Sequence, residues 1–204
     1  MPQRRSSSNE KARAKGFTLV EVVVSMAVLS IGLLGVAALI SGTLASGTRA
    51  RYMNIANVLA SEKLDNLNKW PSNSPDVAPG GSLAGPAVCA AGDLYCDQIT
   101  VSEAGNADSE TQTQVDANGA LVTNTIVHTS AGCVGTPANC GVAIPAGTDS
   151  TFTRRWLITL NPTITSAAGA PTTATGARRI TVLVTLNGQS RQSPVTFQMS
   201  MVRP

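Results

Sequence analysis

Residues 17–40 read FTLVEVVVSMAVLSIGLLGVAALI, a run of 24 residues in which Glu21 is the single charged side chain. As a helix, this run would be about 36 Å long at 1.5 Å per residue, enough to cross the roughly 30 Å hydrocarbon layer of a bilayer. The run therefore predicts a single-pass transmembrane helix over residues 17–40.

The flank that precedes this run is basic. Residues 1–16 contain five basic side chains and one acidic one, and these are Arg4, Arg5, Lys11, Arg13, Lys15 and Glu10. Because basic flanks stay in the cytoplasm, this charge predicts a cytoplasmic N-terminus and an exported C-terminal part. Without residues 1–16 the chain has ten basic residues against eleven acidic ones, so its net charge of +3 is a topology signal and argues against a nucleic-acid partner.

The apolar run has three possible interpretations, and they differ in how well they explain the charged side chain of Glu21. A secretory signal peptide would have a shorter apolar stretch that ends at a small-residue cleavage site, and no such site follows Ile40. A plain signal anchor fits the length but gives no reason for a carboxylate, which costs about 2.5–3.5 kcal/mol at the centre of a membrane helix and less near its end. An acid in this place therefore indicates a functional partner.

The third interpretation supplies that partner. Residues 15–21, KGFTLVE, resemble the processing and methylation motif of type IV prepilins. The resemblance implies that a prepilin peptidase cuts after Gly16 and methylates the new N-terminus at Phe17. It also implies that Glu21, the fifth mature residue, is the assembly glutamate. The carboxylate would neutralise the ammonium of Phe17 in an apolar environment, where either charge alone is costly.

Two subfamilies remain open within this resemblance. Residues 30–35, SIGLLG, look like the PilV branch of the minor pilins. That resemblance implies a subunit that acts in pilus initiation, assembly or adhesion through its N-terminal helix and its contacts with other pilin subunits. The pseudopilins of type II secretion share the same processing motif and are the alternative.

The helical pattern continues beyond the apolar run. Residues 41–70 form an amphipathic continuation, with apolar positions at Tyr52, Ile55, Leu59, Leu64 and Leu67. Pro71 then predicts the end of the helix, and residues 71–87 contain four prolines and read as a connection.

Strand signals concentrate towards the C-terminus. Alternating or β-branched stretches predict strands over 153–161, 179–186 and 195–201, with further strands around 98–101 and 121–127. Residues 161–177 are expected to form an exposed loop. The sum is an α+β, pilin-like fold, in which one long helix packs on an antiparallel sheet. We expect a leader over 1–16, a membrane segment over 17–40, its continuation over 41–70 and a globular head over 71–204.

The four cysteines form two pairs with the same spacing, Cys89/Cys96 and Cys133/Cys140. Export places them in an oxidising compartment, so disulfides are expected. Local pairing is favoured because both loops contain glycine, and each bond would contribute roughly 2–3 kcal/mol in the chain-entropy model. Concentric pairing, Cys89 with Cys140 and Cys96 with Cys133, is the competing arrangement. A four-thiolate zinc site would more typically show closer spacing, so no metal is expected.

Two basic pairs stand in the head, Arg154-Arg155 and Arg178-Arg179. They are interpreted as ordinary strand-flanking charge that discourages edge pairing, with a small cationic patch as the alternative. His128, the single histidine, is expected on the surface or in a loop.

The chain has no motif for hydrolysis, phosphate binding or dinucleotide binding. We therefore expect neither catalytic residues nor a cofactor. The hypothesis is a minor pilin held in the bacterial inner membrane, with a periplasmic head, and assembled into an extracellular filament. A membrane-anchored module that binds DNA or a surface glycan is the alternative from another class.

Overall fold

The computed structural model describes residues 17–102, 107–141, 150–165, 169, 171–187 and 195–204. Its first element is helix α1 (Leu19–Lys69), which ends directly before Trp70 and Pro71. The chain divides into two units at the boundary between Gly47 and Thr48, and α1 contributes to both. The leader expected over 1–16 lies outside the described residues.

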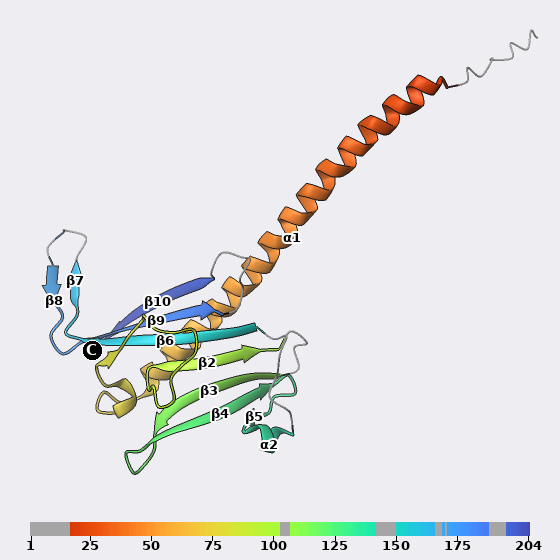
Figure 1. Cartoon of the computed structure of the whole chain (residues 1–204). Coiled ribbons are helices and arrows are strands. Elements are labelled where there is room, and N and C mark those ends of the chain that lie inside the picture. The colour runs from red at the N-terminus through yellow and green to blue at the C-terminus, as the bar shows by residue number, and fades with distance from the viewer. Residues whose placement is uncertain (1–16, 103–106, 142–149, 166–168, 170, 188–194) are drawn as a thin grey trace, which may run out of the picture. The chain divides into compact units, whose positions relative to one another are not determined.

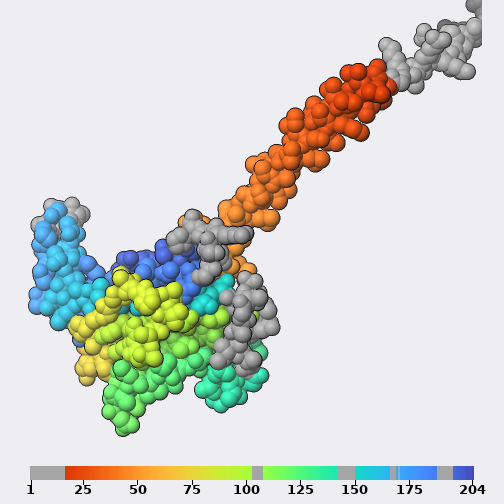
Figure 2. Space-filling view, in the orientation of Figure 1, coloured from red at the N-terminus to blue at the C-terminus, as the bar shows by residue number. Residues whose placement is uncertain are grey.

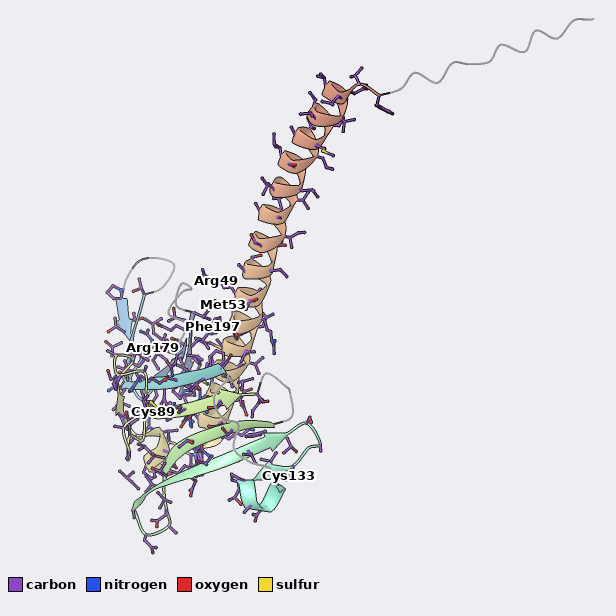
Figure 3. All side chains as sticks on the ribbon, turned by 45° about the vertical axis from the view of Figure 1, so that its right-hand side comes forward. Arg49, Met53, Cys89, Cys133, Arg179 and Phe197 are labelled. Carbon is purple, nitrogen blue, oxygen red and sulfur yellow. A yellow bond between two sulfur atoms is a disulfide. The ribbon has the colours of Figure 1, made fainter. Side chains whose placement is uncertain are left out.

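The first unit, as far as it is described, is the apolar part of α1. Every residue from Leu19 to Gly47 is exposed, and Figure 3 shows short carbon side chains along this part of the helix. Its large apolar side chains lie mostly between 53% and 81% exposed, as at Val36 and Leu19. Exposure on this scale means that an apolar environment must come from outside the chain.

The second unit, residues 48–204, contains an eight-stranded antiparallel sheet (Figure 1). Its strands are β1 (Gly80–Gly81), β2 (Cys96–Val101), β3 (Ala107–Val115), β4 (Leu121–Thr129), β5 (Val134–Gly135), β6 (Ser150–Leu160), β9 (Arg178–Leu186) and β10 (Thr196–Arg203). The strand order is β10-β9-β6-β2-β3-β4-β5, and β1 pairs with β6 next to the end of β2. The expected α+β fold is therefore confirmed.

The smaller elements connect or extend this sheet. The 3₁₀-helix η1 (Pro75–Val77) follows α1, and the short helix α2 (Pro137–Cys140) follows β5. Strands β7 (Thr163–Thr165) and β8 (Pro171–Thr173) form a separate two-stranded sheet that stands out from the rest of the head (Figures 1 and 2). Residues 161–177 were expected to form an exposed loop; most of the described ones are exposed, but they include the paired strands β7 and β8.

All five strands predicted from the sequence are present, with bounds within three residues of those expected. Strand β3 was missed, because its sequence ADSETQTQV lacks alternating apolar residues. The structure gives the reason. One face of β3 carries Asp108, Glu110 and Gln112. Two of these residues have polar partners on β4, His128 opposite Asp108 and Asn124 opposite Gln112. None of the three side chains belongs to the apolar core.

The core lies between the second half of α1 and strands β6 and β9. Its helical residues are Tyr52, Ala56, Ala60, Leu64 and Leu67, and its strand residues include Phe152, Trp156, Ile158, Ile180, Val182 and Val184. Met53 and Phe197 are partly buried and pack against this core (Figure 3). Ile55 and Leu59, both expected to be buried, are only half-buried. Each fully buried large side chain contributes about 1.5–3 kcal/mol.

Candidate functional site

The start of α1 places the residues of the processing motif. Gly16 lies outside the described residues, and Phe17 is 81% exposed just before the helix. Thr18 caps the helix, because its Oγ1 accepts a hydrogen bond from the Glu21 backbone N–H at 3.3 Å and its carbonyl accepts one from the Val22 N–H at 3.2 Å. The spacing Thr-x-x-Glu is that of a capping box, a signal that the sequence analysis overlooked.

This cap gives Glu21 a second, local role. A carboxylate in the first turn of a helix is stabilised by the partial positive charge of the helix N-terminus, by about 0.3–1 kcal/mol. Among the described residues, however, no cation forms an ion pair with Glu21. The helix end therefore offsets only part of the free-energy cost of placing a carboxylate in lipid. A cation from another molecule could offset the remainder.

The apolar part of α1 meets the requirements of a membrane span by length and composition, with a mean hydropathy of 2.5 over an 18-residue window. Four of its hydroxyl groups donate to carbonyls of the same helix at 2.8–3.0 Å, and these belong to Ser30, Ser41, Thr43 and Ser46. Polar groups that are satisfied within the helix can enter lipid without a large desolvation cost.

A second group of charges lies beneath the other half of α1. We call Lys63, Asp97, Glu110 and Arg154 the buried charge cluster. Lys63 Nζ lies 2.9 Å from Asp97 Oδ2, and Arg154 donates to the same carboxylate oxygen at 2.7 and 3.1 Å. Arg154 also pairs with Glu110 and donates to the carbonyl of Leu59 at 3.1 Å. The cluster thereby joins α1 to β2, β3 and β6.

Burial and charge act in opposite directions on the two acids of this cluster. Burial would raise the pKa of Asp97, but the positive charges of Lys63 and Arg154 outweigh it and hold this pKa below its ordinary value. Burial raises the pKa of Glu110, because the nearby charge of Arg154 offsets it only in part. Asp97 is therefore the permanent anion of the cluster, shared by two cations.

Lys63 has an additional partner. Its Nζ lies 3.9 Å from the ring centroid of Trp156, the geometry of a cation–π contact. The alkyl stem of Lys63 thus covers the core while its charge meets Asp97. Lys63 is buried to 7% exposure, although the sequence pattern marks only apolar positions for the core.

The interpretation of Arg154 and Arg155 as ordinary strand-flanking charge was wrong. Both side chains are buried, at 2% and 8% exposure, and each makes specific ion pairs. They point to opposite faces of β6, as alternation along a strand requires. Local sequence patterns could not reveal the partners of Arg154, because Asp97 and Glu110 lie 57 and 44 residues from it.

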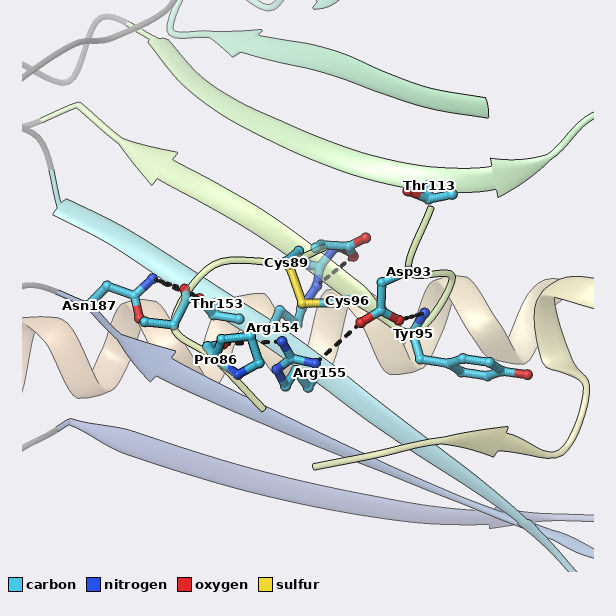
Figure 4. Close-up of a disulfide and its surroundings, with 12 residues drawn as sticks. Pro86, Cys89, Asp93, Tyr95, Cys96, Thr113, Thr153, Arg154, Arg155 and Asn187 are labelled. Carbon is cyan, nitrogen blue, oxygen red and sulfur yellow. Dashed lines mark hydrogen bonds and ion pairs between the residues drawn. A yellow bond between two sulfur atoms is a disulfide. The ribbon is translucent and has the colours of Figure 1, made fainter. Parts of the chain in front are cut away.

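Arg155 organises the other face of the sheet, where residues 82–95 form a strap. Its guanidinium pairs with Asp93 at 3.3 Å and donates to the carbonyl of Pro86 at 3.1 Å (Figure 4). Gly85 lies directly against it, so a Cβ at that position would be 2.5 Å from the Arg155 Cζ. Asn187 donates to the carbonyl of Ala87 at 2.8 Å, next to the contact of Arg155 with Pro86.

The disulfides follow the local pairing. The bonds Cys89–Cys96 and Cys133–Cys140 have Cα–Cα distances of 5.6 and 5.8 Å. The first bond fixes the strap to β2, and the second closes the turn that contains α2 (Figures 3 and 4). With all four sulfurs in disulfides, the thiolates that a zinc site would require are not formed.

His128 was expected on the surface or in a loop, and it belongs to a strand. It lies half-buried in β4, directly opposite Asp108 of β3. Among the described residues, no group of three or more His, Cys, Asp or Glu side chains has an arrangement that could hold a metal ion.

The N-terminal part of the chain matches a protein-family model. Residues 11–47 match the family model described as the prokaryotic N-terminal methylation motif. The chain therefore carries the methylation motif of type IV prepilin-like proteins, joined to a head with a pilin-like α+β layout. This combination is similar to that of pilin-like and pseudopilin-like proteins. Comparisons with curated proteins and with solved structures gave no match.

Proposed function

We propose that this chain is a minor pilin, processed by prepilin peptidase and incorporated into a type IV pilus through α1. In this proposal residues 1–16 are the cleaved leader, residues 17–40 span the inner membrane, residues 41–70 continue the helix and residues 71–204 form the exported head. The observation that carries the proposal is the methylation motif over 11–47, which joins a basic flank to an apolar helix with Glu21 in its first turn.

The physical argument concerns the charges at the start of the mature helix. Cleavage after Gly16 creates an ammonium at Phe17, one helical turn from the carboxylate of Glu21. In lipid either charge alone is costly, whereas a pair at low effective dielectric is strongly favourable. A pair between neighbouring subunits would bring α1 into the filament and set the register of one subunit against the next.

The minor-pilin subtype is supported by residues 30–35, SIGLLG, within the apolar run. The role in initiation, assembly or adhesion belongs to this subtype. A pseudopilin of type II secretion would be processed in the same manner. The two assignments are therefore distinguished by the kind of filament that contains the chain. Recovery of the chain in sheared surface pili favours the pilin, whereas recovery only with a secretion complex favours the pseudopilin.

Mass spectrometry of the mature N-terminus tests the proposal. We expect an N-methylated phenylalanine at Phe17 in cells that contain prepilin peptidase, and the uncut chain in cells that lack it. Substitution of Gly16 by alanine provides the matched control, in which cleavage should fail. An intact leader on the exported protein in the presence of the peptidase would overturn the proposal.

A further inference from the structure

A groove lies in the head between the second half of α1 and strands β2, β3 and β4, and we call it the head groove. It encloses about 380 Å³, within the size range of pockets that bind small ligands. All of its lining residues belong to 48–204, so it lies within one of the two units of the chain.

The floor of the head groove is aliphatic. Helix α1 supplies Ile55, Val58 and Leu59, and β2 supplies Ile99 and Val101. The side chain of Val58 is 61% exposed, and Val101 is half-buried. An occupant that covers this floor with hydrocarbon therefore removes apolar surface from water, which favours its binding.

Three acids surround this floor. Glu62 comes from α1, and Asp108 and Glu110 come from β3. Glu110 is paired with Arg154, and one oxygen of Asp108 accepts a hydrogen bond from the Ser102 N–H at 3.2 Å. Among the described residues, neither Glu62 nor Asp108 forms an ion pair, and no lysine or arginine lines the groove. The groove is therefore apolar at its floor and negative around it.

The excess of negative charge acts on Glu110. Burial raises the pKa of this side chain, and the charges of Asp97 and Glu62 raise it as well, so that the lowering effect of Arg154 is overcome. A cation placed in the groove would reduce this repulsion between carboxylates. Charge complementarity thus favours a positively charged occupant over a neutral or anionic one.

The positions of the acids indicate how many cations the occupant has. Asp108 and Glu110 are two residues apart on one face of β3, so their Cα atoms lie about 7 Å apart. On β2 they are paired with Val101 and Ile99, so aliphatic side chains lie beside both acids. A complementary ligand therefore has two cations joined by a short hydrocarbon chain.

We propose that the head groove binds a linear aliphatic diamine. One ammonium group contacts Glu62 and Glu110, the other contacts Asp108, and the methylene chain covers Ile99 and Val101. A protonated primary amine is a compact charge with three N–H donors, which allows it to contact carboxylates from different elements of the fold. The inference goes beyond the proposed function and does not depend on filament assembly.

His128 provides the measurement, because it is the single histidine of the chain and lines the groove. The full-length chain is labelled with carbon-13 at histidine and purified in nonionic detergent micelles with a tag that lacks histidine. Titration with 1,5-diaminopentane at constant pH and ionic strength should shift the imidazole NMR signals along a saturable curve. We expect a dissociation constant of about 1 mM. Pentane-1,5-diol, which has the same chain without charge, should leave the signals in place.

Three variants locate the diamine. Glu62→Gln and Asp108→Asn should each weaken its binding about fivefold, the upper range for an exposed ion pair. Asp108→Asn keeps an oxygen that can accept from the Ser102 N–H. Asp65→Asn is the matched control, because Asp65 is exposed on the same helix but does not line the groove, and it should leave the dissociation constant unchanged.

Four outcomes would overturn the inference. A shift that does not saturate shows that no site exists, and an equal response to Mg²⁺ at the same ionic strength shows that the hydrocarbon chain contributes nothing. Equal weakening by Asp65→Asn places the diamine outside the groove. A response to an acetylated lysine amide without a response to the diamine assigns the groove to a lysine of a partner protein instead.

Discussion

Two carboxylates in apolar surroundings, Asp97 and Glu21, differ in how their negative charge is compensated. Asp97 is fully buried in the head, and its own chain supplies Lys63 and Arg154 within 2.9 Å. Glu21 stands in an exposed apolar helix, and among the described residues it has only the helix N-terminus to stabilise it. The chain thus supplies two cations to one acid and, among the described residues, none to the other. In the proposal made above, the first acid serves folding and the second serves assembly. The compensation of Asp97 lies wholly within residues 48–204, because Lys63 comes from the second half of α1 and Arg154 from β6.

The largest effect is expected at Asp97. Asp97→Ala leaves Lys63 and Arg154 buried without their shared anion, so the free energy of unfolding should fall by about 3–5 kcal/mol. Urea unfolding of the full chain in detergent micelles, followed by tryptophan fluorescence, measures this change. Asp93→Ala is the matched control, since its pair with Arg155 is longer, at 3.3 Å, and 28% exposed on the acid side. Equal effects of the two variants would show that the cluster does not anchor the head.

The two disulfides are expected to contribute unequally to the stability of the head. Each closes a separation of seven residues, so the chain-entropy model gives both the same contribution, roughly 2–3 kcal/mol. Cys89→Ser with Cys96→Ser should nevertheless cost more than Cys133→Ser with Cys140→Ser. Cys96 is 2% exposed, and its bond holds the strap over Arg155.

The same urea titration, performed on both double variants, gives the difference directly. Equal losses of unfolding free energy would mean that the strap keeps its place without the bond. A greater loss from the second pair would contradict the role assigned to Arg155 and the strap.

The assembly side of the comparison is tested at Glu21. Glu21→Ala should reduce recovery of the chain in sheared filaments at least tenfold, the effect of about 1.4 kcal/mol, because the ammonium of Phe17 loses its anion. The unfolding free energy of the head should not change. Ser25→Ala, a change one turn further along the same helix, serves as the control. If the Glu21→Ala variant is recovered in filaments as well as the native chain, Glu21 has no role in assembly.

The sequence predicted what depends on local patterns. The apolar run, the helix end before Pro71 and strands such as β9 follow from composition and periodicity, and all are present. What it missed depends on contacts between distant residues. Arg154 was misread because its acidic partners come from other strands. β3 was missed because polar residues occupy both of its faces, including the buried Ser109 and Thr113 and the half-buried Glu110 that pairs with Arg154.

The smallest effect is expected from pH, through Glu110. Because burial raises the pKa of Glu110 above its ordinary value of 4.5, this residue binds protons more readily in the folded chain. Its contribution to stability is present below pH 4.5 and is lost as the pH rises through the raised pKa. Glu110→Gln removes this titration and keeps the size of the side chain. The stability of the native chain relative to this variant should therefore fall as the pH rises above 4.5, and then become constant.

Asp97 provides the contrast in the same experiment. The pKa of Asp97 is lowered from an ordinary value of 3.8, so its contribution is present above that pH and is lost in more acidic solution. The two acids of one cluster thus titrate in opposite senses and in separate windows, although both contact Arg154. Unfolding free energies of the native chain and Glu110→Gln, measured from pH 3 to pH 8, distinguish them. If the difference instead grows in favour of the native chain above pH 4.5, Arg154 holds Glu110 as a permanent anion, and the cluster has two anchoring acids.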